Sequence, residues 1–92
     1  MYKRNIFSSS RFAKKLKKVN EHRRNLVLIA VDKFRKGEDD TLRIHKLQGT
    51  YKGFWSFDAD YDLRIIYSLT KSGTIIIHNL ENFGTHKELY GK

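Results

Sequence analysis

The hydrophobic pattern of this chain changes its period near the middle. Before Gly37 the apolar residues recur every three to four positions, and after Asp40 they alternate with polar residues. A period near 3.6 is typical of helices that bury one side, whereas a period of two is typical of strands. The chain therefore predicts an α+β fold in which helices come first and pack on one face of a sheet.

A strand and a helix are expected first. Residues 2–7 alternate loosely and lead into the serine cluster of residues 8–10, whose hydroxyls can cap the exposed amides of a following helix. Three apolar side chains then recur at the spacing of one helical face: Phe12, Leu16 and Val19. Lysines fill the remaining faces, and this helix is expected to end near Asn20.

A second helix is expected over residues 21–36. Its apolar stripe comprises Leu26, Val27, Ala30, Val31 and Phe34. Gly37 is placed to end this helix, because glycine readily adopts the left-handed conformation found after helix C-termini. The two helices are then antiparallel neighbours with a tight joint.

The second half predicts consecutive antiparallel strands over residues 42–47, 54–58, 63–69 and 74–80, separated by turn-forming sequences. In the last of these, isoleucines lie on both faces, which predicts a central strand covered on both sides. Residues 85–90 predict one helical turn. The expected fold is a single domain over residues 1–92. It has an N-terminal strand, two antiparallel helices on one face of a mainly antiparallel four- to five-stranded sheet, and a short C-terminal helix.

The charge of the chain predicts an anionic partner. Nineteen lysine and arginine residues against ten aspartate and glutamate residues give a net charge of +9 at pH 7, which attracts nucleic acid, an acidic protein or an anionic membrane. No apolar run approaches the roughly 20 residues of a membrane span, and the N-terminus lacks a secretion signal. The absence of cysteine excludes disulfides and fits a cytoplasmic protein, and the four histidines have no recognised zinc spacing. No metal or other cofactor is expected.

Three motifs in the second half carry a family resemblance. They are His45-Lys46-Leu47-Gln48-Gly49 followed by Lys52-Gly53, then Leu63-Arg64-Ile65-Ile66-Tyr67, and finally Gly84-Thr85-His86-Lys87-Glu88-Leu89-Tyr90. In order and spacing they resemble the RelE superfamily of bacterial toxins, and within it the YafQ-like branch of ribosome-dependent messenger RNA endonucleases. The resemblance covers nearly the whole chain and implies the RelE-like fold.

The resemblance also implies an active site. The positions that match catalytic residues of YafQ-like enzymes are His45, Asp62 and His86, and the aromatic residue expected four positions later is Tyr90. The chain departs from that pattern at Asp58, where the branch carries another histidine, and at Leu63, where an aromatic residue is usual. Asp58 is nevertheless counted among the candidate catalytic residues, with its role left open.

Two basic residues match the RelE branch instead. Arg64 corresponds to the arginine of an Arg-X-X-Tyr strand that helps to hold the scissile phosphate, and Lys52 occupies a roughly corresponding basic position. The implied reaction is metal-independent attack of a ribose 2′-hydroxyl on the adjacent phosphate.

Roles within that reaction follow from the chemistry of each side chain. His86 is the first candidate for proton transfer and His45 the second, because histidine titrates near neutral pH. Asp62 is expected to orient or tune a histidine. Cations that would stabilise the phosphate are Arg64, Lys46 and Lys52, and aromatic residues that could stack on a base are Trp55, Tyr61 and Tyr90.

The implied partners are an acidic cognate antitoxin, the ribosome and messenger RNA, with operator DNA reached only through the antitoxin. Two alternatives stay open: a ParE-like inhibitor of DNA gyrase without nuclease activity, and a catalytically degenerate RNA-binding protein of the same fold. Individual residues also have simpler interpretations. His78 is expected to be a buried strand residue, Trp55 is more often core than a stacking surface, and an exposed Asp–Arg pair contributes little.

Overall fold

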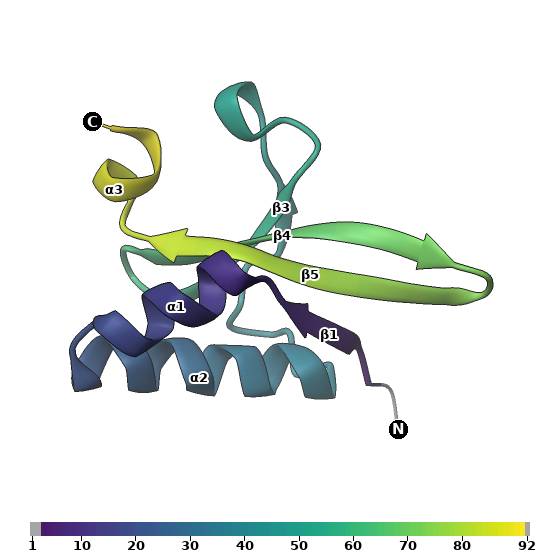
Figure 1. Ribbon diagram of the computed structural model, residues 1–92, viewed down its shortest axis with the longest axis horizontal. Coiled ribbons are helices and arrows are strands. Elements are labelled where there is room, and N and C mark those ends of the chain that lie inside the picture. The colour runs from purple at the N-terminus through teal and green to yellow at the C-terminus, as the bar shows by residue number, and fades with distance from the viewer. Residues whose placement is uncertain (1–2, 92) are drawn as a thin grey trace.

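The computed structural model describes residues 3–91, which form one mixed sheet with helices on both of its faces (Figure 1). The elements in chain order are β1 (Asn5–Ser8), α1 (Ser10–Lys18), α2 (Glu21–Lys36), β2 (His45–Lys46), the 3₁₀ turn η1 (Gly49–Tyr51), β3 (Trp55–Asp60), β4 (Leu63–Ser72), β5 (Ile75–Gly84) and α3 (His86–Tyr90). None of the helices within these residues is long and apolar enough to cross a membrane.

The two long helices begin and end where local sequence signals place them. The Ser9 hydroxyl accepts a hydrogen bond from the Phe12 amide at 3.1 Å, and the Asn20 side chain accepts one from the Arg23 amide at 2.8 Å. These are N-cap interactions that satisfy exposed amides of the first turn. Gly37 ends α2 in the left-handed conformation, with φ 78°. The predicted bounds of the second helix are confirmed, and α1 ends two residues before Asn20.

The sheet has the strand order β1-β5-β4-β3-β2. β1 is parallel to β5, while the other neighbouring strands are antiparallel. The helix pair α1 and α2 lies along one face of this sheet (Figure 1). The expected α+β fold is therefore confirmed, with five strands. The part of the expected first strand at residue 2 lies outside the described residues.

The main core fills the space between the helix pair and the sheet. Phe34 of α2 stacks on Phe57 of β3 with ring centroids 4.2 Å apart, and Phe12 of α1 meets Phe83 of β5 edge-on at 5.2 Å. All four phenylalanines are buried. Aromatic contacts of this kind fix the distance and angle between the helices and the sheet.

The opposite face, which we call the distal face, carries the side chains of Ser56, Asp58, Arg64 and Ile66. They alternate along β3 and β4 with core residues such as Phe57 and Ile65. One end of this face is covered by α3 and η1 (Figure 1), whose contacts bury Leu47, Ile66 and Leu89 in a second small core.

Two strand predictions are wrong. The strand expected over residues 42–47 is reduced to His45–Lys46, because Arg43 adopts a positive φ of 53° that interrupts extended backbone. The last strand is not covered on both sides at its beginning, where Ile75 and Ile76 are 52% and 48% exposed. This part of the β4–β5 hairpin extends beyond the ends of the helices (Figure 1).

Candidate active site

Strand pairing brings several of the predicted site residues into one row across the distal face. Asp58 of β3 lies directly opposite Arg64 of β4, which in turn lies opposite Gly84 of β5. Neighbouring strands are about 4.8 Å apart, so the row spans about 10 Å. His86 follows Gly84 by two residues at the start of α3, and His45 lies opposite Ser56, on the same face as Asp58.

Asp58 is the most unusual member of this row. Its side chain is 17% exposed, and its Oδ2 lies 3.8 Å from Nε of Arg43. Its other oxygen, Oδ1, is buried and makes no hydrogen bond within residues 3–91. Burial raises the pKa of the Asp58 carboxyl above its usual value of 3.8, although the positive charges of Arg64 and Arg43 oppose this shift. Asp58 thus holds a proton more readily than an ordinary aspartate.

The ring of His45 is oriented by two contacts. Its Nδ1 lies 2.8 Å from the backbone carbonyl oxygen of Arg43, and its Nε2 lies 3.4 Å from the hydroxyl of Ser56. A carbonyl can only accept a hydrogen bond, so Nδ1 carries the proton in this arrangement. Nε2 is then the nitrogen with a free lone pair, and it can accept a proton.

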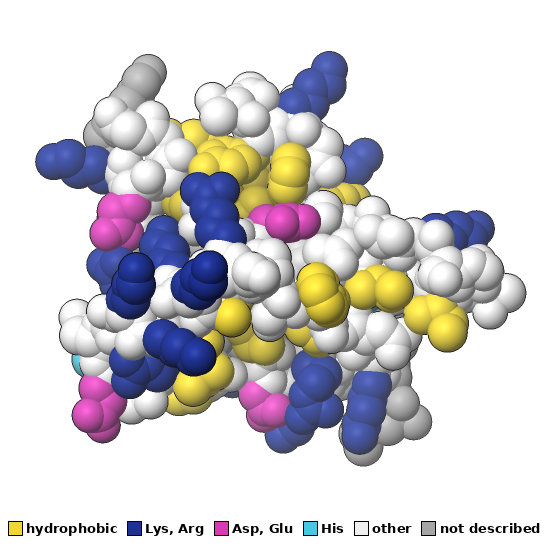
Figure 2. Space-filling view, viewed as in Figure 1, with side chains coloured by type: hydrophobic (Ala, Val, Ile, Leu, Met, Phe, Trp, Pro, Cys, Tyr) yellow, Lys and Arg dark blue, Asp and Glu magenta, His cyan; other side chains and the backbone are white. Residues whose placement is uncertain are grey.

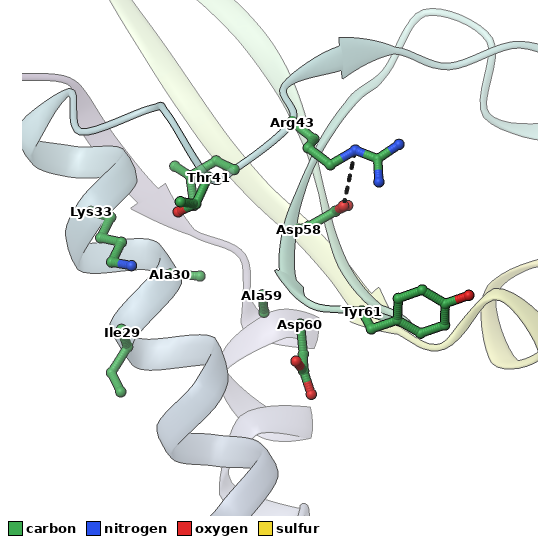
Figure 3. A pocket seen from close by; sticks show the side chains of 10 residues that line it. Ile29, Ala30, Lys33, Thr41, Arg43, Asp58, Ala59, Asp60 and Tyr61 are labelled. Atoms are coloured by element: carbon green, nitrogen blue, oxygen red, sulfur yellow. Dashed lines mark ion pairs between the residues drawn. The ribbon is translucent and has the colours of Figure 1, made fainter.

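A groove of about 300 Å³ lies beside Asp58 (Figure 3). Ile29 and Lys33 of α2 line one side, and Arg43, Asp58 and Tyr61 line the other. Tyr61, in the turn between β3 and β4, is 98% exposed. A fully exposed aromatic ring beside this groove is available for stacking on an unpaired base.

The helix α3 places His86 next to Tyr90, with ring centroids 4.6 Å apart. Asp62 accepts a hydrogen bond from the backbone amide of His86 at 3.0 Å, so it fixes the start of the helix rather than the imidazole ring. At the other end, the Tyr51 hydroxyl donates to the Leu89 carbonyl oxygen at 3.2 Å. Both ends of α3 are therefore held by hydrogen bonds to residues from other parts of the chain.

A family model described as "Bacterial toxin of type II toxin-antitoxin system, YafQ" matches residues 4–91. The chain belongs to the YafQ family of bacterial type II toxins.

Solved structures agree with this assignment of the YafQ-family chain. A point mutant of YafQ from E. coli is 25% identical, with a TM-score of 0.69, and the match covers 96% of this chain and 99% of that one. YafQ in the E. coli DinJ–YafQ complex is 25% identical, with a TM-score of 0.64 and coverage of 96% and 99%. The RelB–RelE complex from Methanococcus jannaschii matches at 21% identity and a TM-score of 0.62, covering 92% and 95%. No curated protein sequence matches the chain.

Not every predicted site residue of this YafQ-family toxin lies on the distal face. Lys46 points to the helix side of the sheet, where its Nζ lies 5.5 Å from the ring centroid of Trp55. Trp55 is partly buried and packs against the main core, stacking on Tyr67 at 6.5 Å. Lys52 is exposed and follows η1. The structure therefore groups His45, Asp58 and Arg64, but separates them from Lys46 and Trp55.

His78 has a structural environment. It is buried, its ring meets Phe34 edge-on at 5.4 Å, and its Nδ1 lies 3.2 Å from the Asn5 carbonyl oxygen. Burial lowers the pKa of His78, which keeps the ring neutral. Its contacts join β1 and α2 to β5.

Sequence reasoning missed Arg43. Nothing local marks this position, because a positive φ is rare for arginine and its neighbours Leu42 and Ile44 fit an alternating strand pattern.

Residues 3–91 contain no cluster of three or more histidine, cysteine, aspartate or glutamate side chains able to hold a metal ion.

Proposed function

We propose that this YafQ-family toxin is an endoribonuclease that cuts messenger RNA on the ribosome and does so without a metal ion. One observation carries the proposal: the side chains of His45, Asp58 and Arg64 share the distal face. The His86–Tyr90 pair of α3 covers one end of that face. Proton carriers, a cation and an aromatic ring are the groups that phosphodiester cleavage by a neighbouring hydroxyl needs.

In the proposed reaction the ribose 2′-oxygen attacks the adjacent phosphorus, and the bond from phosphorus to the 5′-oxygen breaks. A base takes the proton of the 2′-hydroxyl, and an acid donates a proton to the departing 5′-oxygen. The products are a 2′,3′-cyclic phosphate and a free 5′-hydroxyl. Each positioned proton carrier typically contributes about 10²- to 10⁴-fold.

We assign the proton transfers to His86 and His45, with Asp58 as the carrier that stands where the branch has another histidine. Asp58 suits that role because burial raises its pKa toward the range in which it exchanges protons. Asp62 contributes by holding the backbone at His86. These roles rest on side-chain chemistry and on the shared face of the sheet.

The remaining candidates would bind the RNA. Arg64 and Lys52 would stabilise charge on the phosphate, and Tyr90 or Tyr61 would stack on a base. Lys46 and Trp55 would contact RNA only where it passes around the exposed edge of β2. Figure 2 shows further lysine and arginine side chains gathered over α1, and these exposed cations are suited to ribosomal RNA phosphates.

We infer that the toxin is neutralised in the cytoplasm by an acidic cognate antitoxin. The net charge of +9 favours rapid association with such a partner. Related toxins have been solved with DinJ and with RelB, in structures titled toxin–antitoxin complexes. Contact with operator DNA is expected only through the antitoxin.

The test is to express the chain briefly from a tight promoter and to map the 5′ ends of a reporter transcript made with and without its start codon. Cuts are expected only in the translated transcript and should disappear in His86→Ala. Growth arrest without such cuts would instead favour a gyrase inhibitor. Continued growth with a folded, ribosome-bound protein would indicate a degenerate toxin.

A further inference from the structure

Arg43 combines a strained backbone with an exposed cation. With φ 53°, it is the one non-glycine residue in residues 3–91 that has a positive φ. In this region the Cβ of an L-residue crowds the backbone, so the conformation persists only where its surroundings impose it, and functional sites are enriched in such residues. Arg43 therefore warrants a functional explanation.

The strained backbone has a direct effect on His45. The left-handed turn at Arg43 presents its carbonyl oxygen to Nδ1 of His45 at 2.8 Å, two residues further along the chain. An extended residue at this position would point its carbonyl toward a neighbouring strand. The conformation of Arg43 thus fixes which nitrogen of His45 carries the proton.

The side chain of Arg43 is poorly satisfied by the protein itself. It is 81% exposed, and its ion pair with Asp58 is a 3.8 Å approach of Nε to Oδ2, which is longer than a hydrogen bond. Arg64 lies on the other side of Asp58, so two guanidinium groups flank one carboxylate. The excess positive charge and the unused planar donors of Arg43 fit a phosphodiester, which can accept two parallel hydrogen bonds from a guanidinium.

We propose that Arg43 is a phosphate-binding and positioning residue of the cleavage site: its guanidinium holds an RNA phosphate beside His45, and its carbonyl keeps the His45 proton on Nδ1. This inference rests on the proposed nuclease function and adds a residue to it. Arg43 and Arg64 then hold the RNA backbone from opposite sides of Asp58.

The decisive variant is Arg43→Gly. Glycine adopts a positive φ without strain, so the carbonyl contact to His45 is kept and only the guanidinium is lost. Arg43→Lys keeps a cation at the same place. Lys71→Gln is the matched control, because it removes one exposed charge from the β4–β5 hairpin, away from the site.

Binding of each purified variant to a labelled short single-stranded RNA is measured across a range of salt concentrations. The slope of log affinity against log salt is expected to fall by about 0.7 in Arg43→Gly, the value for one lost contact to single-stranded RNA. Arg43→Lys and Lys71→Gln should keep the wild-type slope. An unchanged slope in Arg43→Gly, or no RNA binding by the wild type, would overturn the phosphate contact.

The positioning role is read separately, from the ring ¹⁵N shifts of His45 in the free protein. They should report a proton on Nδ1 in the wild type and in Arg43→Gly. Arg43→Val should move the ring toward the Nε2-protonated form, because a β-branched residue disfavours positive φ. A wild-type ring protonated on Nε2 overturns this role.

Both measurements are independent of cleavage. A wild type that binds RNA through Arg43 but cuts no transcript would refute the proposed nuclease and leave this inference standing. If the wild type cuts on the ribosome, Arg43→Gly is expected to cut about 100-fold more slowly, in line with loss of one preorganised donor.

Discussion

Asp58 illustrates how a single residue can be adapted by its surroundings. Its carboxyl is largely buried on the distal face, while the neighbouring guanidinium groups of Arg64 and Arg43 favour its charged form. Burial has the larger effect, and the pKa rises. An aspartate in this setting can exchange protons at a higher pH than usual, which brings its chemistry closer to that of a histidine.

The pH dependence of stability tests this account. A carboxyl whose folded-state pKa lies above its unfolded value stabilises the fold at low pH and loses that contribution as pH rises through the folded pKa. Relative to wild type, the free energy of unfolding of Asp58→Asn should therefore increase between pH 4 and pH 7, measured by urea denaturation.

Asp32→Asn is the matched control for that experiment. Hydrogen bonds from Lys36 and Arg35 lower the pKa of the exposed Asp32 carboxyl, so its contribution has the opposite sign and is present at pH 7. Its variant should lose stability relative to wild type as pH rises. If both variants shift in the same direction, burial does not control Asp58.

Which candidate residues could be read from the sequence depended on the kind of signal. His45, Asp62 and His86 stand in recognisable motifs, so they could be named as candidates in advance. That His45 shares a face with Asp58 and Arg64 required the strand register, which also sends Lys46 to the opposite face. Arg43 could not be found, because its backbone conformation is imposed by tertiary structure and no neighbouring residue signals it.

At the scale of elements, α3 depends on its attachments. Five residues are too few for a helix to be stable in isolation. Thr85 and Glu88 form a capping box, the Glu88 carboxylate pairs with Arg23 of α2 at 2.9 Å, and Asp62 holds the first amide. Gly84 allows close packing, since a Cβ there would lie 3.0 Å from the Glu88 Oε1.

Thr85→Ala should loosen α3 without unfolding the domain. Removing an N-cap side chain typically costs about 1 kcal/mol, and here the loss falls on a helix that carries His86 and Tyr90. We expect faster hydrogen exchange at the Glu88 and Leu89 amides, together with slower RNA cleavage. Thr85→Ser, which keeps the hydroxyl, should match the wild type; equal exchange in Thr85→Ala would show that the cap is dispensable.

The elements best predicted from the sequence are those whose first and last residues are marked by capping residues next to them. Asn20 and Gly37 bracket α2, so its bounds were predictable. The prediction of a strand over residues 42–47 was wrong because Arg43 adopts a left-handed conformation. The prediction that Ile75 and Ile76 are buried was wrong because alternation along a strand does not say how far the neighbouring helices reach.

At the scale of the whole molecule, stability rests on one layer of packing between the helix pair and the sheet. A domain of this size buries only about 60 to 65% of its unfolded surface and has a small margin. Phe34 is central to that layer, because it is fully buried and contacts Phe57, Tyr67 and His78.

Phe34→Ala is accordingly expected to lower the free energy of unfolding by about 3 to 5 kcal/mol, a large part of the total for a small domain. Phe7→Ala, which truncates a side chain that is 59% exposed, should change it by less than about 1 kcal/mol. Urea denaturation of both variants at pH 7 compares them directly. Similar losses would mean that the layer is not the main source of stability.

The pairing of β1 with β5 has a consequence for how the protein is made. Asn5 meets His78 across 73 positions of the chain, and β1 pairs with no other strand of the described sheet. A nascent chain can form the α1–α2 pair early, but its first strand has no partner until β5 has left the ribosome. Contacts of such long separation close slowly. His45, Asp58 and Arg64 lie on β2, β3 and β4, so they are all synthesised before β5, the strand that joins them to β1 in one sheet.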